Sequence, residues 1–347
     1  MRYREFLTEK PNRDQLKKMR RIYNKMEQNP AVIDELWKTV SMKVQDDEGN
    51  LNHRILKALQ PENTNPETDQ TFAKGFIDGL VAAIDKTEGT VEEKIQFANT
   101  LGSVDHIDTK ALLQPLAGWS DWLVGTPFAQ RLFDTMFNLP AFRTDNKGPG
   151  EVALAILSPK ITLAKTKGDI VVDGKPIEVK GGKGAQGGKL TPTKATLGML
   201  YGNKEFWKNL VPDDPVKAAE LAKVNKITAT NYSAFLEEYG LDEKHSQIIL
   251  STIFKADGLD NLISKAAKKG SGVTAADLIA IAVKNYGLSQ GDEHFLILQS
   301  NIRTSLYFDV DDLSPILNRL SFRLPLIDSD SRSQAQAQIG ILSKSRK

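Results

Sequence analysis

Residues 168–180 read GDIVVDGKPIEVK. Two runs of mostly β-branched residues flank Asp173-Gly174, and this dipeptide between such runs is a strong signal for a β-hairpin with a two-residue turn. In that hairpin Asp169 pairs directly with Glu178 across the two strands. Cross-strand neighbours have Cβ atoms about 4.5–5.5 Å apart, so we expect the two carboxylates to lie close together.

The charged side chains of this hairpin share one face. Lys180 lies two residues after Glu178 and therefore projects to the same side of the strand, where Asp169 joins them. Val171 is the apolar exception on this face. The opposite face carries side chains suited to a core: Ile170, Val172, Ile177 and Val179. Two close carboxylates repel unless a cation lies between them or one is protonated. A site of oxygen ligands favours a hard cation, Mg²⁺ or Mn²⁺.

The amino-acid composition limits the kinds of functional site that the protein can have. The 347 residues include no cysteine and only four histidines, which excludes disulfides, zinc fingers and thiol catalysis and argues against a histidine-rich metal site. The net charge of +2 gives no global sign of a nucleic-acid partner, so any such signal has to be local. The chain contains no run of about 18 apolar residues and opens on a polar segment, so we expect neither a membrane span nor a secretory signal.

The pattern of Asp169, eight residues, then Glu178-Val179-Lys180 resembles the PD-(D/E)XK nuclease superfamily. Its signature is an aspartate at the start of one strand and an acidic-x-Lys on the next, usually with an acidic residue from a preceding helix, where Glu151 stands here. The resemblance implies that Asp169 and Glu178 hold Mg²⁺, which Mn²⁺ can replace, with help from the Val179 carbonyl. Glu151 would assist this metal or hold a second one. Lys180 would orient or deprotonate the attacking water.

The resemblance also implies the fold and the extent of the domain. It predicts an α/β protein (α+β with extra helices) with a restriction-endonuclease-like core. The match covers residues 148–189, and strands expected at 294–299 and 305–310 would complete the sheet. The family's proline before the aspartate is Gly168 here, and Gln186 stands for the polar residue that often follows the lysine.

Lysines gather around the hairpin. Residues 158–194 contain eight lysines and three acidic residues, a local charge of +5. Such a segment favours a polyanionic substrate through contacts with phosphates. We therefore expect four residues to contact DNA: Lys147, Lys183, Gln186 and Lys189. The basic segment 13–25 is open to two interpretations, a second phosphate-binding surface or the charged outer face of a helix.

The spacing of apolar residues and the positions of Pro, Gly and polar stretches suggest three regions. Residues 1–140 form a mostly helical N-terminal region, 141–326 the nuclease-like core with a helical insertion near 193–290, and 327–347 a polar C-terminal tail. Trp119 and Trp122 fit packing within the helical region better than stacking on bases.

Together these features predict a Mg²⁺-dependent deoxyribonuclease, an endonuclease rather than an exonuclease. The opening residues 4–9 resemble the start of many tailed-phage proteins, which suggests genome processing, packaging or recombination in the host cytoplasm or the virion. The expected partners are DNA, further copies of the chain, and virion or packaging proteins, with no membrane. Two alternatives stay open: a non-catalytic DNA-binding or virion structural protein that keeps a nuclease-like fold, and a helical interaction protein in which the hairpin is incidental.

Overall fold

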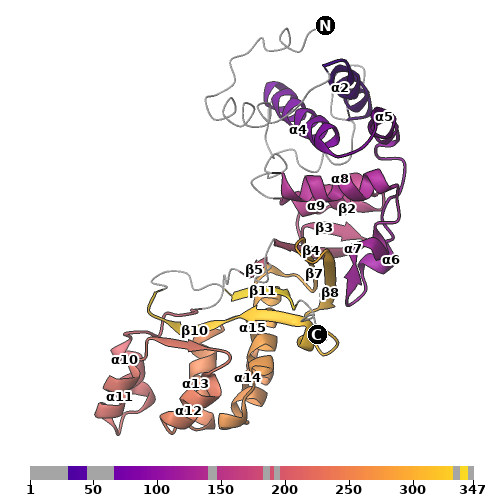
Figure 1. Ribbon diagram of the computed structural model, residues 1–347. Helices are drawn as coiled ribbons and strands as arrows, with labels where there is room; N and C mark the ends of the chain where they lie inside the picture. The colour runs from indigo at the N-terminus through magenta and orange to yellow at the C-terminus, as the bar shows by residue number, and fades with distance from the viewer. Residues whose placement is uncertain are drawn as a thin grey trace. The chain divides into compact units, whose positions relative to one another are not determined.

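The computed structural model describes residues 30–44, 66–139, 147–182, 188–190, 196–330 and 337–342. This part of the chain is a mixed α/β protein, as predicted, and it divides into two compact units (Figure 1). The first unit ends at Leu112 and resumes over Gly118–Lys175, and the second comprises Leu113–Ala117 and the chain from Pro176 onward. The division falls inside the predicted hairpin, directly after its turn.

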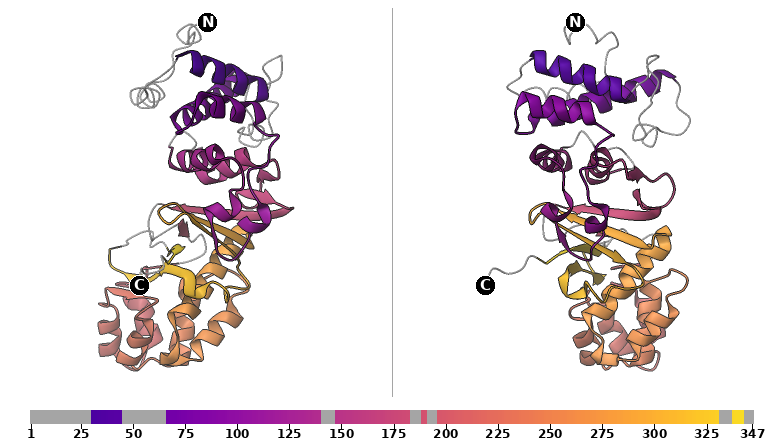
Figure 2. Two further views of the ribbon diagram at one scale, coloured as in Figure 1. Left: turned by 45° about the vertical axis from the view of Figure 1, so that its right-hand side comes forward. Right: turned by 90° about the vertical axis from the view of Figure 1, so that its right-hand side faces the viewer.

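Helices make up most of the first unit. Their bounds are α2 (Pro30–Val44), α4 (Pro66–Lys86), α5 (Val91–Thr100), α6 (Thr109–Leu112), α7 (Trp119–Trp122), α8 (Pro127–Asn138) and α9 (Pro149–Leu157). Thr90 begins α5 with a capping box, in which its hydroxyl accepts from the Glu93 N–H at 3.2 Å and the Glu93 carboxylate accepts from the Thr90 N–H at 2.8 Å. Helices α2, α4 and α5 lie together in both views of Figure 2.

Aromatic packing forms the core beneath α7 and α8. Trp119 and Trp122 are buried, and each meets the ring of Phe133 edge-on, at centroid distances of 4.8 Å and 5.2 Å. The interpretation of the two tryptophans as core residues is therefore confirmed, because buried rings are not available to bases.

A two-stranded ladder ends the first unit. Strand β2 (Ile161–Leu163) runs antiparallel to β3 (Ile170–Val172), with Ile161 opposite Val172 and Leu163 opposite Ile170. All four of these side chains are buried, because alternate residues of each strand face the same side.

A mixed sheet lies at the centre of the second unit. In this unit the sheet includes β4 (Lys175–Gly182), β7 (His294–Gln299) and β8 (Thr304–Asp309), which are neighbours in the order β4-β7-β8. Strand β7 runs parallel to β4, with Glu178 beside Phe295, and antiparallel to β8, with Phe295 opposite Phe308. The two strands predicted near 294–299 and 305–310 are thus present and lie in the same sheet as β4.

Shorter strands add two small sheets to this unit. Strand β11 (Ala337–Ile341) lies between β5 (Gly188–Leu190) and β9 (Leu320–Arg323), and β10 (Pro325–Asp328) pairs with β6 (Lys226–Thr228). The segment predicted as a polar tail therefore contains a strand. Its Ser, Gln and Lys content suggested a tail. The side chains of Ala337, Ile339 and Ile341 are nevertheless buried, and their burial holds β11 in place. The two-residue strand β1 (Ala117–Gly118) lies at the boundary between the units, where the Ser305 hydroxyl donates to the Ala117 carbonyl at 3.3 Å.

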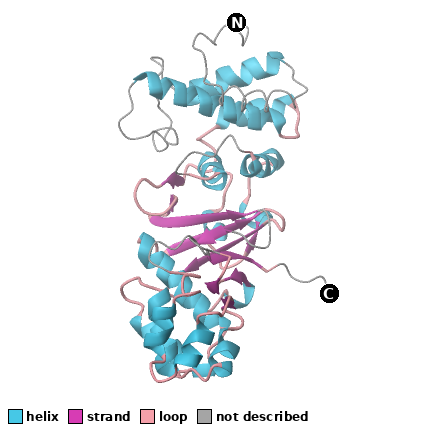
Figure 3. Ribbon diagram, turned by 90° about the vertical axis from the view of Figure 1, so that its left-hand side faces the viewer, coloured by secondary structure: helices cyan, strands magenta, loops and turns pink. Residues whose placement is uncertain are grey.

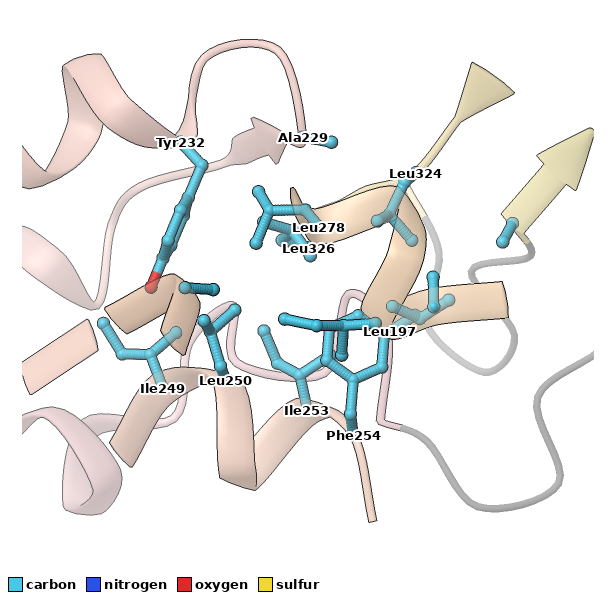
Figure 4. Close-up of a cluster of buried hydrophobic side chains, with 14 of the residues drawn as sticks. Leu197, Ala229, Tyr232, Ile249, Leu250, Ile253, Phe254, Leu278, Leu324 and Leu326 are labelled. Carbon is cyan, nitrogen blue, oxygen red and sulfur yellow. The ribbon is translucent and has the colours of Figure 1, made fainter. Parts of the chain in front are cut away.

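Helices fill the stretch between β5 and β7, where we predicted a helical insertion, and gather on one side of the strands (Figure 3). Their bounds are α10 (Lys204–Leu210), α11 (Pro215–Leu221), α12 (Tyr232–Glu238), α13 (Glu243–Ile253), α14 (Asp260–Ala267) and α15 (Ala275–Gln290), with short 3₁₀ turns η3 (Gly270–Gly272) and η4 (Leu317–Arg319). Figure 4 shows how Tyr232, Leu250 and Leu278 from three of these helices meet Leu326 of β10 in one apolar core.

Candidate active site

The turn of the hairpin has the predicted geometry. Asp173 and Gly174 have φ angles of 51° and 79°, and they separate β3 from β4 as a two-residue turn. A type I′ turn requires positive φ at both central residues, which glycine adopts freely and aspartate tolerates better than most other residues. Asp173-Gly174, from which the hairpin was predicted, thus has the positive φ angles that a type I′ turn requires.

The strands flanking the turn alternate as expected. Ile170, Val172, Ile177 and Val179 are buried, whereas Asp169, Val171, Glu178 and Lys180 are only partly buried. The division into an apolar face and a charged face, including the exceptional position of Val171, is therefore confirmed. Burial of the apolar side chains fixes the direction of the charged ones, because a shift of one residue would exchange the faces.

In the second unit, Glu178 and Lys180 of β4 form a close ion pair, and Tyr286 of α15 contacts this pair. The ammonium of Lys180 contacts Oε1 of Glu178, and the Tyr286 hydroxyl donates to the same oxygen at 3.1 Å. The Lys180 nitrogen also lies 5.4 Å from the centre of the Tyr286 ring, within reach of a cation–π contact. The side chains of Glu178 and Lys180 are 12% and 17% exposed, so the pair is largely withdrawn from water.

The protonation states follow from these contacts. Burial alone would lower the pKa of Lys180, but the neighbouring Glu178 carboxylate and the Tyr286 hydroxyl outweigh it and raise this pKa above its usual value. Burial raises the pKa of Tyr286 to about 12, although Lys180 acts in the opposite direction. At neutral pH, Lys180 is therefore an ammonium and Tyr286 a neutral hydroxyl that can donate.

In the first unit, Asp169 is held by Lys147. The Lys147 ammonium lies 3.4 Å from Oδ1 of Asp169 and donates to the Gly168 carbonyl at 3.1 Å. Both side chains are mostly buried, and their ion pair ties Lys147 to the loop that leads into β3. Sequence reasoning assigned Lys147 to DNA contact. The structure adds a local role for it, because a lysine at this position balances the charge of Asp169.

Glu151 lies in the first turn of α9 and is 8% exposed. Its carboxylate accepts from the Gly148 N–H, which is the reach-back contact of a capping box. A carboxylate in the first turn also interacts favourably with the helix dipole. The sequence suggested Glu151 as a metal ligand. The structure shows that it stabilises the start of its own helix, and ligation stays a prediction.

The remaining predicted site residues are distributed as follows. Val179 is buried on β4, and Lys189 is exposed on β5, whereas Lys183 and Gln186 lie outside the described residues, as does the basic segment 13–25. Asp169 and Glu151 belong to the first unit, and Glu178, Val179 and Lys180 to the second. The convergence of all four catalytic candidates in one cleft stays a prediction.

Within the described ranges, Tyr286 and Gly188 are neighbours of Lys180 that sequence reasoning missed. Tyr286 follows Glu178 by 108 positions, and Gly188 lies beyond a glycine-rich stretch. A single tyrosine in an apolar helix carries no signal of its partner. Only the packing of α15 and β5 against β4 reveals either residue.

The donor chemistry of Glu178 and Asp169 fits a hard divalent cation, since both offer carboxylate oxygens. Among the described residues no three or more His, Cys, Asp or Glu side chains gather in a metal-binding arrangement.

Comparisons of the chain with protein-family models, with curated proteins and with solved structures found no match. Within the described ranges no helix combines the length and the apolar character that crossing a bilayer requires.

Proposed function

We propose that the chain is a metal-dependent nuclease that hydrolyses DNA phosphodiester bonds. The observation that carries the proposal is the Glu178–Lys180 ion pair on a strand that follows a tight hairpin turn, with Asp169 directly before the preceding strand. In the proposed site, the register that a two-residue turn favours would bring Asp169 opposite Glu178. Two carboxylates and an ammonium on one sheet face are the groups that phosphodiester hydrolysis needs when histidine and cysteine are scarce.

Each residue has a distinct role in the proposed reaction. Asp169 and Glu178, with the Val179 carbonyl, would hold Mg²⁺, which supplies Lewis acidity and neutralises charge on the phosphate. Lys180 donates from its ammonium and orients the attacking water in line with the scissile bond. As an ammonium it can also stabilise the negative charge that grows on the phosphate oxygens.

The surroundings support a polyanionic substrate. The local excess of lysines in residues 158–194 lies on the same part of the chain as the proposed catalytic groups. Lys189 is exposed on β5, directly after Gly188, which lies against Lys180. Phosphate contacts of this kind release counterions, so binding of DNA should weaken steeply as salt is added.

A plasmid-nicking assay tests the proposal. The purified chain is expected to nick supercoiled DNA with Mg²⁺ or Mn²⁺ and to lose this activity in excess chelator. Lys180→Ala and Asp169→Ala are expected to abolish nicking while circular dichroism and the thermal midpoint show a folded chain. Lys175→Ala is the matched control, because Lys175 is an exposed lysine on the same strand. Retained nicking by folded Lys180→Ala would defeat the mechanism.

A second candidate is a non-catalytic DNA-binding or virion structural protein with a nuclease-like fold. One observation favours it: the Lys180 ammonium already balances the charge of Glu178, so this carboxylate does not need a metal for that purpose. Such a protein would bind DNA in a salt-sensitive manner and show no nicking with either cation. The same assay, with a binding measurement beside it, separates the two functions.

A further inference from the structure

Tyr286 is anchored on the face of the sheet that carries Glu178. Its helix, α15, begins at the Thr274 cap, whose hydroxyl accepts from the Asp277 N–H at 3.3 Å, and ends at Gly291 in the left-handed conformation. The Tyr286 ring lies 5.7 Å from the ring of Phe295, the residue beside Glu178 on the neighbouring strand. The ring is therefore held by packing as well as by the hydrogen bond of its hydroxyl.

The end of α15 is closely packed as well. A Cβ built on Gly287 would come 2.6 Å from the Asp292 carbonyl oxygen and 3.0 Å from Val310, so only glycine allows this approach. The Asp292 N–H also donates to the Gly287 carbonyl at 2.9 Å. These contacts hold the residue next to Tyr286 in one place and limit movement of the tyrosine along the sheet.

Tyr286 acts on both members of the ion pair. Its hydroxyl and the Lys180 ammonium both contact Oε1 of Glu178, so the carboxylate is turned by two donors on one oxygen. Both of these donors contact Oε1, so neither of them occupies Oε2, the other oxygen of the carboxylate. The face of the ring lies near the Lys180 ammonium and attracts it.

We infer that Tyr286 is a positioning residue of the nuclease site, which fixes the Glu178 carboxylate with Oε2 available to the metal and holds the Lys180 ammonium beside it. This inference rests on the proposed function. Hydrogen-bond partners that orient a ligating carboxylate typically change metal affinity or activity by about 10–100-fold when they are removed. The tyrosine makes no proton transfer in this role and is not itself a catalytic residue.

Tyr286→Phe tests the inference, because it removes the hydroxyl and keeps the ring. The full chain is titrated with Mn²⁺ and followed by electron paramagnetic resonance without DNA, and nicking gives kcat and KM separately. We expect Mn²⁺ affinity to fall about 10-fold and kcat to fall by a similar factor, with KM for DNA unchanged. Tyr286→Leu, which also removes the ring near Lys180, is expected to lower kcat further.

Tyr307→Phe is the matched control. Tyr307 also lies in the second unit, and its hydroxyl forms a hydrogen bond with His294 at 3.1 Å. The substitution therefore removes a tyrosine hydroxyl that does not contact Glu178. Mn²⁺ affinity and kcat should then equal those of the wild type.

The outcomes separate the inference from the function on which it rests. A wild-type chain that neither binds Mn²⁺ nor nicks DNA would overturn the proposed function and the inference with it. An active wild type, with Tyr286→Phe equal to it in Mn²⁺ affinity and kcat, would overturn the inference alone. A lower thermal midpoint in Tyr286→Phe without those changes would show a purely structural tyrosine and also overturn it.

Discussion

Gly188 of β5 lies directly against the side chain of Lys180 on β4. A Cβ built on Gly188 would come 2.9 Å from Cγ of Lys180 and closer still to its Cβ. The small sheet of β5, β11 and β9 therefore covers the aliphatic part of Lys180, while its ammonium reaches Glu178. Gly188 thus contacts the aliphatic part of Lys180, and the Tyr286 ring lies near its ammonium.

Gly188→Ala is expected to displace the Lys180 side chain, because the added methyl group occupies its space. Overpacking of this kind typically destabilises a protein by about 1–3 kcal/mol. Urea denaturation measures the loss of stability, and the nicking assay is expected to show a lower rate. An unchanged denaturation midpoint would mean that β5 moves aside without penalty, contrary to the close packing described.

Gly75→Ala is expected to change the stability in the opposite direction and to stabilise the protein. Gly75 lies within α4, and a Cβ built there meets no atom within 4 Å. Alanine should stabilise the helix by about 0.5–1 kcal/mol, because glycine loses more backbone entropy on folding. The same urea titration tests this expectation, and a destabilised variant would contradict it.

Lys147→Met should loosen the loop before β3. The substitution removes the ion pair with Asp169 and the hydrogen bond to the Gly168 carbonyl, yet keeps most of the apolar stem. Hydrogen bonds that involve a charged group contribute about 1.5–3 kcal/mol, so a loss of that order is expected in chemical denaturation. Lys165→Met, at an exposed lysine of the same loop, is the control and should change stability by less than about 0.5 kcal/mol. Equal effects of the two variants would show that the Asp169 contact adds nothing.

His106 should make the first unit sensitive to acid. The ring is buried, and its Nδ1 has no hydrogen-bond partner among the described residues. Burial lowers the pKa of His106 below its ordinary value of 6.5, although Asp105 acts in the opposite direction. Below pH 6.5 the unfolded chain binds a proton that the folded chain resists, so stability falls as the pH falls.

Denaturation midpoints at pH 7.5 and pH 5.5 provide the measurement for His106. The difference between the two midpoints should shrink in His106→Leu, which cannot take up a proton. A difference as large as in the wild type would place the acid sensitivity elsewhere in the chain.

Leu278→Ala should strongly destabilise the second unit. Leu278 is fully buried in the core shown in Figure 4. Truncation of a buried leucine costs about 2–5 kcal/mol through lost burial and the cavity left behind. Ile248→Ala, at an exposed position of α13, should stay within about 0.5 kcal/mol of the wild type in the same thermal or urea experiment. Comparable losses in both variants would mean that the cluster is not the core of this unit.

Much of the hairpin could be predicted because its signals are local. Asp173-Gly174 selects the turn, and the alternation from Ile170 to Val179 selects the buried face. The strand β11 was missed because five residues within a polar segment give a weak periodic signal. Its burial depends on β5 and β9, which lie about 150 and 15 residues before it.

The sequence by itself determined the turn at Asp173-Gly174, the alternation of buried and partly buried side chains along the two flanking strands, and that no cysteine can take part in any site. These properties follow from the period of two along a strand and from the choice of residues, and both can be read locally. The tertiary structure alone decided that Tyr286 and Gly188 hold Lys180, that Lys147 balances Asp169, and that Glu151 caps its helix. The contacts of Tyr286, Gly188 and Lys147 depend on how whole elements pack against one another, and the Glu151 contact depends on the direction of one side chain. Neither kind of information is contained in the spacing of a motif.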